Sequence, residues 1–91
     1  MKKVIWKYPL LSTPHQTLHL PKGAEILSLD MQDNIPCMWV LITQQTDLEE
    51  RHFRTIGTGN LLDDHFTGPY RFIGTYQPQS NLVFHVFETK D

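Results

Sequence analysis

Short runs of alternating apolar and polar residues, each closed by turn residues, constrain this chain more than any other feature. Side chains of a β-strand point alternately to two faces, so a period of two predicts a strand. β-Branched and aromatic residues, which favour strands, are frequent in these runs. The seven runs are Val4–Tyr8, Gln16–Leu20, Glu25–Gln32, Pro36–Thr43, Arg51–Ile56, Tyr70–Gln77 and Leu82–Phe87.

The segments between the runs carry the residues that turns require. Pro21-Lys22-Gly23 and Asp33-Asn34 are two examples. The longest segment without a strand pattern is Asn60–Pro69, where we expect at most one helical turn, around Leu61-Leu62. Seven short strands predict a mainly β fold, either a small antiparallel β sandwich or a partly open barrel. Residues 1–91 should form one domain, because two cores would each be too small.

The alternation also predicts the core. In the run 25–32, Leu27, Leu29 and Met31 share one face, and we expect that face to be inside. Gly74 interrupts the sixth run and indicates a bulge or a close backbone approach. The side chains expected to be largely buried are Leu27, Leu29, Trp39, Leu41, Phe84 and Val86.

Two runs, Pro36–Thr43 and Leu82–Phe87, are apolar on both faces. Such strands lie in the middle of a two-layer structure or face another subunit. A chain of this size buries only about 60–65% of its unfolded surface, so a partner would add stability. We therefore predict a homo-oligomer whose interface uses one of these strands or an edge beside it.

Charge and cysteine content exclude several functions. Eight basic and ten acidic residues give a formal charge of −2, which does not favour duplex nucleic acid. The single cysteine, Cys37, excludes an internal disulfide and a cysteine-rich zinc site, and it fits a reducing compartment. No apolar run approaches the roughly 20 residues that span a bilayer. We expect a cytoplasmic protein with no membrane contact.

The five histidines do not predict a metal site. His15 and His19 lie four residues apart on a predicted strand, which separates them by roughly 13 Å. His85 lies in an apolar run and is expected to be packed or hydrogen-bonded. The triplets His15-Gln16-Thr17 and His65-Phe66-Thr67 fit the His-x-Thr pattern of two-histidine phosphoesterases, which leaves a small phosphoesterase as an alternative.

No catalytic residue or cofactor can be assigned. Asp63-Asp64-His65 lies in a segment without a strand pattern, where adjacent carboxylates are usually solvated. Cys37 lies in a run that reads as buried, which disfavours its thiolate. The interpretation that follows is a protein that is not an enzyme.

A small anionic ligand, such as a nucleotide, would find its best partners around Gly57-Thr58-Gly59. Glycines at the end of a strand let backbone amides approach a phosphate, although they can also serve only the turn. Arginine binds phosphate through paired hydrogen bonds, and aromatic rings stack on bases. The expected ligand-binding residues are Arg54, Gly57, Thr58, Gly59, Asn60, Tyr70, Arg71 and Tyr76.

Several segments together resemble a family of short uncharacterised phage and prophage proteins. They are Ile5–Tyr8, Pro21–Ser28, Pro36–Trp39, Phe53–Gly59, Ile73–Tyr76 and Leu82–Glu88. That family has no established catalytic residues, so none carries over to this chain. The resemblance implies a phage-related, non-enzymatic binding protein that acts against host defence, for example by sequestering a nucleotide signal in the bacterial cytoplasm. A protein-interaction or structural module is the alternative.

Overall fold

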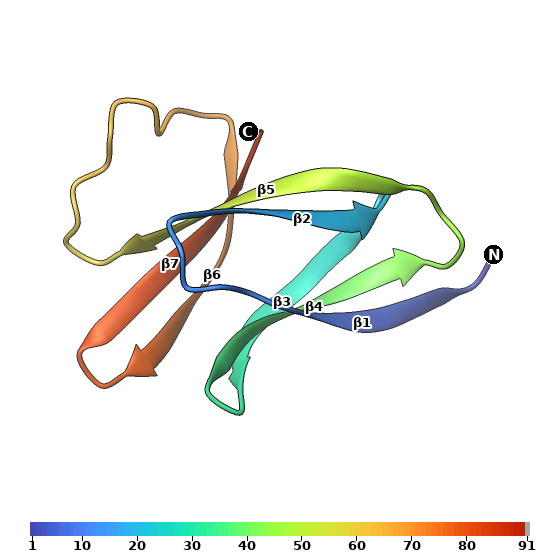
Figure 1. Ribbon diagram of the computed structural model, residues 1–91, viewed down its shortest axis with the longest axis horizontal. Helices are drawn as coiled ribbons and strands as arrows, with labels where there is room; N and C mark the ends of the chain where they lie inside the picture. Colours follow the sequence, from blue (N-terminus) through green and yellow to red (C-terminus); the bar gives the residue numbers. More distant parts are fainter. Residues whose placement is uncertain (91) are drawn as a thin grey trace.

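A computed structural model describes residues 1–90 and shows an all-β chain; only Asp91, the last residue of the predicted domain, lies outside them. Each predicted run is found as a strand, and the helical turn expected around Leu61-Leu62 is absent from the described chain. Residues 1–90 contain no helix with the length and apolarity needed to cross a membrane. The strands are β1 (Lys3–Pro9), β2 (His15–Pro21), β3 (Glu25–Gln32), β4 (Ile35–Thr43), β5 (Leu48–Gly57), β6 (Tyr70–Gln79) and β7 (Leu82–Thr89) (Figure 1).

The strands form two antiparallel sheets that pack together as a β sandwich, which confirms the predicted fold class. One sheet has the order β1-β4-β3 and the other the order β2-β5-β7-β6. The hairpin between β3 and β4 turns at Asp33 and Asn34, whose φ angles are 52° and 65°. Two consecutive positive φ angles are typical of the tight hairpin turn that matches strand twist, and Asp-Asn tolerates them.

The core lies between the inner faces of the two sheets. Met38 and Val40 face it from the three-stranded sheet, and Phe53 and Val86 face it from the four-stranded sheet. Val86 is buried as predicted, whereas Trp39, Leu41, Leu29 and Phe84 are half-buried. The buried apolar residues are Leu10, Leu20, Ala24, Ile26, Cys37, Met38, Val40, Phe53, Tyr76 and Val86.

The prediction that Leu27 is buried is wrong, because its side chain is 44% exposed. Ile26 pairs with Val40 and Ser28 pairs with Trp39, so Leu27 is an extra residue in a β-bulge. A bulge shifts the alternation by one residue. The side chains of β3 that face the core are therefore Ile26 before the bulge and Leu29 after it.

Gly74 lies both at a β-bulge and at a close approach of the backbone, the two features that the sequence indicated as alternatives. The register between β6 and β7 shifts between Phe72 and Gly74. A Cβ at position 74 would lie 3.1 Å from the Leu29 Cβ, where β6 meets β3 of the other sheet. The absence of a side chain therefore lets the two sheets approach closely at this point.

The two strands that are apolar on both faces have different surroundings. On the outer side of β7, the Phe87 ring is covered by Phe66 from the segment between β5 and β6, with ring centroids 5.3 Å apart. On the outer side of β4, Trp39 and Leu41 remain half-exposed. The apolar pattern of β7 is thus satisfied within the chain.

Candidate functional site

Residues 58–69, which we call the β5–β6 loop, form a wide arch at one end of the molecule (Figure 1). Phe66 fixes this loop to the four-stranded sheet. Its ring stacks on Tyr70 at 4.8 Å and meets the edge of Phe87 at 5.3 Å. Aromatic contacts of this kind add stability beyond the area that they bury. The loop is therefore held by a small aromatic cluster.

Arg54 lies beneath this loop and is largely enclosed by it. Its guanidinium carbon is 5.2 Å from the centre of the Phe66 ring, and its Nη2 donates a hydrogen bond to Asp63 Oδ2 at 3.1 Å. The side chain is only 11% exposed, and Nε is buried without an acceptor among residues 1–90. An unsatisfied buried donor is costly, so its position calls for an acceptor. Arg54 thus anchors the loop and keeps one donor unused.

The Asp63 carboxylate is the internal partner of this arginine. Desolvation opposes its ionisation, but the His65 amide hydrogen bond and the Arg54 guanidinium outweigh that effect and lower the pKa of Asp63. The amide of His65 donates to Asp63 Oδ1 at 2.9 Å. Asp63 is therefore ionised throughout the physiological range and neutralises Arg54.

A hollow of about 190 Å³ opens between Arg54, the loop and the end of β7, and we call it the basic hollow. Three basic residues, Arg54, His65 and Lys90, contribute to its wall. A shallower hollow of about 290 Å³ shares Lys90 and holds Tyr70 and Arg71. The basic hollow is lined by Arg54, His65, Phe66, Thr67, Gly68, Pro69, Thr89 and Lys90. This composition suits an anionic group the size of a phosphate.

The Gly57-Thr58-Gly59 segment forms a tight turn. The Asn60 amide donates to the Gly57 carbonyl at 3.1 Å, and the Thr58 amide donates to the Val83 carbonyl at 3.0 Å. Gly59 has a φ of 86°, and a Cβ at Gly57 would lie 2.7 Å from Asn60 Nδ2. Turn geometry therefore accounts for both glycines, and two amides expected to face an anion already have acceptors.

His85 is hydrogen-bonded at both ring nitrogens, as its place in an apolar run predicted. Thr58 Oγ1 lies 2.6 Å from its Nε2, and Thr75 Oγ1 lies 3.1 Å from its Nδ1. His85 and Thr58 border a hollow of about 290 Å³, whose apolar wall includes Leu62, Phe66 and Phe87. His85 therefore positions two hydroxyl groups.

The structure divides the predicted ligand-binding residues between different places. Arg54, Tyr70 and Arg71 lie at the basic hollow or beside it, whereas the segment 57–60 lies at the other end of the loop. Tyr76 is only 4% exposed and its hydroxyl is 3.3 Å from Ser12 Oγ, so its ring belongs to the core.

Sequence reasoning missed Lys90 and gave His65 no binding role. His65 had been noted only within a carboxylate cluster and a triplet, and Lys90 carries no local motif. The pairing of β5 with β7 brings the end of β7 beside Arg54. Only this pairing could have identified Lys90.

Within residues 1–90, no three His, Cys, Asp or Glu side chains are grouped so that they could hold an ion. The two His-x-Thr triplets also differ in setting. Thr17 Oγ1 lies 3.0 Å from His52 Nδ1, whereas His65 and Thr67 line the basic hollow.

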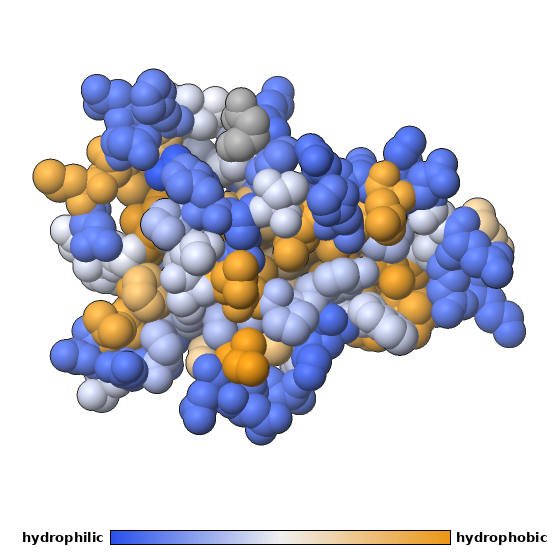
Figure 2. Space-filling view, in the orientation of Figure 1, coloured by the Kyte–Doolittle hydropathy of each residue, from blue (hydrophilic) through white to orange (hydrophobic). Residues whose placement is uncertain are grey.

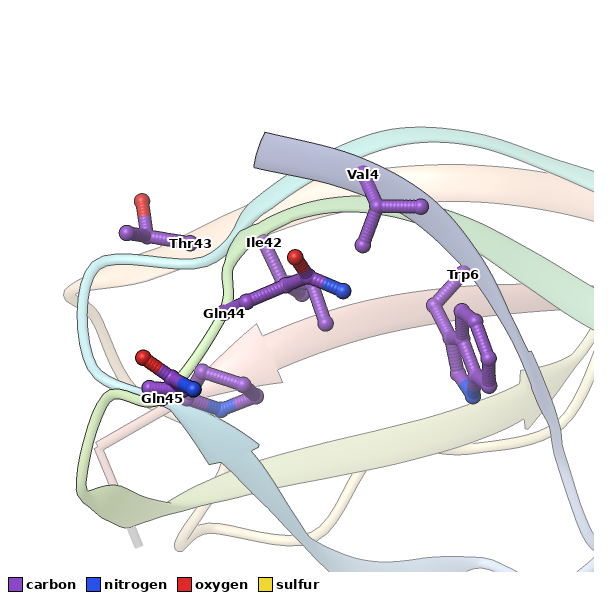
Figure 3. Close-up of a pocket in the computed structure, with 7 residues that line it drawn as sticks. Val4, Trp6, Ile42, Thr43, Gln44 and Gln45 are labelled. Atoms are coloured by element: carbon purple, nitrogen blue, oxygen red, sulfur yellow. The ribbon is translucent and has the colours of Figure 1, made fainter. Parts of the chain in front are cut away.

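A third place was not expected from the sequence. A hollow of about 390 Å³, here called the end hollow, lies between β1, the end of β4 and Pro21. Figure 3 shows the side chains of Val4, Trp6 and Ile42 around it. Trp6 is 55% exposed, and no charged residue lines this hollow. Because Thr43, Gln44 and Gln45 also line it, the end hollow suits an uncharged group with both apolar and polar parts.

Comparison with known proteins gives a family and no individual relative. No curated protein matches this chain, and no solved structure matches it. The family model described as "Domain of unknown function (DUF7352)" matches residues 1–91. Because this match covers the whole chain, the protein belongs to the DUF7352 family.

Proposed function

We propose that this protein is a non-enzymatic binding protein for a small phosphate-bearing ligand of the nucleotide class. The phage-like segments of its sequence support a role in counter-defence, in which it sequesters a host nucleotide signal. The ligand phosphate would occupy the basic hollow. Its base would lie toward Tyr70, whose side chain is half exposed at the neighbouring hollow.

One observation carries this proposal: Arg54 Nε is a buried, unsatisfied donor on a side chain that lines the basic hollow. Lys90 and His65 add two more groups that can donate to an anion there. Arginine is well suited to phosphate because its N–H groups match two oxygens at once. Tyr70 supplies an aromatic surface of the kind that bases stack on.

In this proposal, the Asp63 carboxylate occupies the acceptor position on Arg54 that the ligand phosphate would take. Its Oδ2 accepts from Arg54 Nη2, as a phosphate oxygen would. The phosphate displaces this carboxylate and the β5–β6 loop shifts, which also gives access to the buried Nε. The ligand must therefore compete with an internal anion.

The test is incubation of the protein with a panel of cyclic and ADP-ribose-type nucleotides, followed by analysis of free and heat-released material. A binding protein releases its nucleotide unchanged, an enzyme converts it, and an interaction module leaves it free. We expect release of an unchanged nucleotide.

Variants then locate the site. Lys90→Ala removes a charge from the basic hollow and leaves the aromatic cluster intact, so it should weaken binding about tenfold. Lys22→Ala, in the exposed turn after β2, is the matched control for loss of a positive charge. If Lys90→Ala and Arg54→Lys both bind as the wild type does, the ligand lies elsewhere.

A second candidate is a protein-interaction or structural module. The observation that favours it is the end hollow, where Trp6 is 55% exposed beside Val4 and Ile42. Large exposed aromatic side chains at an uncharged hollow are typical of interfaces. Under this alternative, no nucleotide in the panel binds, and Trp6→Ala changes association without changing ligand binding.

A further inference from the structure

Strand β1 ends the three-stranded sheet, and its outer edge is regular. All seven of its residues pair with β4 without a register shift. The amide of Gln44 donates to the Lys2 carbonyl at 2.9 Å, and the amide of Leu10 donates to the Pro36 carbonyl at 2.8 Å. Main-chain groups alternate in direction along an antiparallel strand. The main-chain N–H and C=O groups of even-numbered residues therefore point toward β4. Those of Lys3, Ile5 and Lys7 point toward the free edge.

The side chains of β1 are also open. Ile5 is 58% exposed and Trp6 is 55% exposed, on opposite faces of the strand. Trp6 faces the end hollow with Val4 (Figure 3). An edge strand with large apolar residues on both faces is unusual for an isolated domain, because its unpaired main-chain groups can pair with a strand of another chain.

Other edges of the sandwich are less suited to pairing. β6 is interrupted by two register shifts, after Phe72 and after Tyr76, which bend and twist a strand. β2 exposes no large apolar side chain within the described chain. β3, the other edge of the three-stranded sheet, is interrupted by the bulge at Leu27. The free edge of β1 is therefore the best site for an added strand.

The surface area indicates how much a partner would cover. The chain exposes 6250 Å². A compact monomer of 10.7 kDa exposes about 5500 Å². The excess of about 750 Å² follows from the flat shape of the sandwich, so a partner could cover surface that a compact chain of this mass would bury itself. Figure 2 shows apolar side chains reaching the surface between polar ones.

We propose that a second copy of this chain pairs with β1 across a twofold axis at Trp6, which joins the two three-stranded sheets. Trp6 is the middle residue of β1, so each of its seven residues faces a residue of the partner. Lys3 and the partner's Pro9 make a single hydrogen bond, because proline has no N–H. Ile5 would exchange two hydrogen bonds with the partner's Lys7, and Lys7 would exchange two with the partner's Ile5. Trp6 would face the partner's Trp6, and Val4 the partner's Tyr8.

Charge selects this register over its neighbour. An axis at Ile5 would place Lys3 opposite the partner's Lys7, and like charges directly opposite each other are destabilising. The axis at Trp6 places Lys3 opposite the partner's Pro9 and brings the two indoles together. Aromatic cross-strand pairs stabilise a sheet, most strongly where the strands approach most closely. The lysines therefore permit one pairing and oppose the other.

Cysteine cross-linking tests the register. In a pair without mutual hydrogen bonds, facing Cα atoms lie about 4.5 Å apart, within the range of a disulfide. Trp6→Cys should therefore form a linked dimer under mild oxidation, whereas Ile5→Cys should not. Both variants keep the buried Cys37, so a difference between them cannot come from linkage through Cys37. Linkage through Ile5→Cys alone would place the axis at Ile5 and overturn the proposal.

A proline tests the backbone pairing. Ile5→Pro removes an amide that points away from β4, whereas Ile5→Ala keeps it. The twofold axis doubles the loss to two hydrogen bonds, so the dimer dissociation constant of Ile5→Pro should exceed that of Ile5→Ala about thirtyfold. Analytical ultracentrifugation measures both constants, and circular dichroism confirms that each variant is folded. A wild-type chain that is monomeric at 100 µM, or equal constants for the two variants, contradicts the proposal.

Discussion

Arg51 links three parts of the chain through one guanidinium group. Its Nη1 donates to the Ala24 carbonyl at 2.9 Å, and its Nη2 donates to Glu88 Oε1 at 3.0 Å, while Nε donates to the other Glu88 oxygen. Both side chains are 15% exposed. The hydrogen bond to Glu88 is the main cause that raises the pKa of Arg51. The pair thus holds β5, β7 and the turn after β2 together.

Removal of one member of this pair should be costly. Glu88→Ala leaves a half-buried guanidinium without its acceptor, and we expect the free energy of unfolding to fall by about 1.5–3 kcal/mol. Arg51→Met combined with Glu88→Leu should cost less than Glu88→Ala, because only Glu49, which lies 3.8 Å from Arg51 and is 38% exposed, then loses a charged partner. Urea unfolding measures both. A double variant that is less stable than Glu88→Ala would show that the ion pair itself supplies the stability.

Gly74 and Leu29 should behave as a coupled pair. Gly74→Ala places a Cβ 3.1 Å from the Leu29 Cβ and should cost about 1–3 kcal/mol through overpacking. Leu29→Ala removes the atoms beyond that Cβ, so the double variant should lose less than the sum of the two, by at least ~0.5 kcal/mol. A urea-unfolding double-mutant cycle measures this coupling. Additive losses would mean that β3 yields freely to the new methyl group.

The β5–β6 loop is an element without secondary structure that depends on one aromatic anchor. Phe66 contacts Tyr70, Phe87 and Arg54, whereas Leu61 in the same loop is 99% exposed. Segments held by few contacts open without unfolding of the whole domain. The stability of this loop should therefore respond to Phe66 and not to Leu61.

Limited proteolysis checks the anchor. Phe66→Ala should increase the cleavage rate within the loop about tenfold, whereas Leu61→Ala should leave it unchanged. The strands supply most of the core, so the cleavage sites should remain confined to the loop. Equal rates for the two variants would show that the aromatic cluster does not hold the loop.

The stabilising contribution of the Asp63 carboxylate to the loop should be lost at low pH. Its pKa is lowered from 3.8 in the folded chain, so its contribution is complete above pH 3.8 and is lost as the pH falls through the lower folded value. The amide proton shift of His65, which donates to Asp63, reports this by NMR. We expect a midpoint below 3.8 that disappears in Asp63→Asn. A midpoint at or above 3.8 would contradict the combined effect of the His65 hydrogen bond and the Arg54 contact.

At the scale of the whole molecule, the sandwich is thin, with principal extents of 43 × 31 × 15 Å. Ten apolar residues are buried in the described chain, and large apolar side chains such as Ile5 and Trp6 remain exposed. A small core gives a small stability margin. Association through β1 would therefore contribute to the stability of the fold itself.

This association should appear in thermal unfolding. If the native state is a dimer, its melting temperature rises with protein concentration, because each tenfold increase stabilises the dimer by about 1.4 kcal/mol. Ile5→Pro, which weakens the dimer, should lower the melting temperature more than Ile5→Ala does at the same concentration. Calorimetry of the three proteins at 10 and 300 µM checks it. A wild-type melting temperature that is independent of concentration would contradict dimerisation.

Much of the fold was predictable because strand formation depends on local pattern. Alternation located five of the strands and β-branched and aromatic enrichment the two that are apolar on both faces. The turn residues Asp33 and Asn34 marked a hairpin that the structure contains. Gly74 was correctly read as a bulge and a close approach. These features are encoded within a few neighbouring residues, so they need no knowledge of the rest of the chain.

The remaining features depend on contacts between distant segments. The bulge at Leu27 changed which side chains of β3 face the core. The alternating pattern does not reveal where such an extra residue lies. Arg54 was a candidate from its neighbours, but only the tertiary structure joined it to Asp63, Phe66 and Lys90. The sequence by itself determined which segments are strands. Tertiary structure decided their order, which one became the free edge and where the basic hollow lies, because pairing between strands is set by the whole core and not by local pattern.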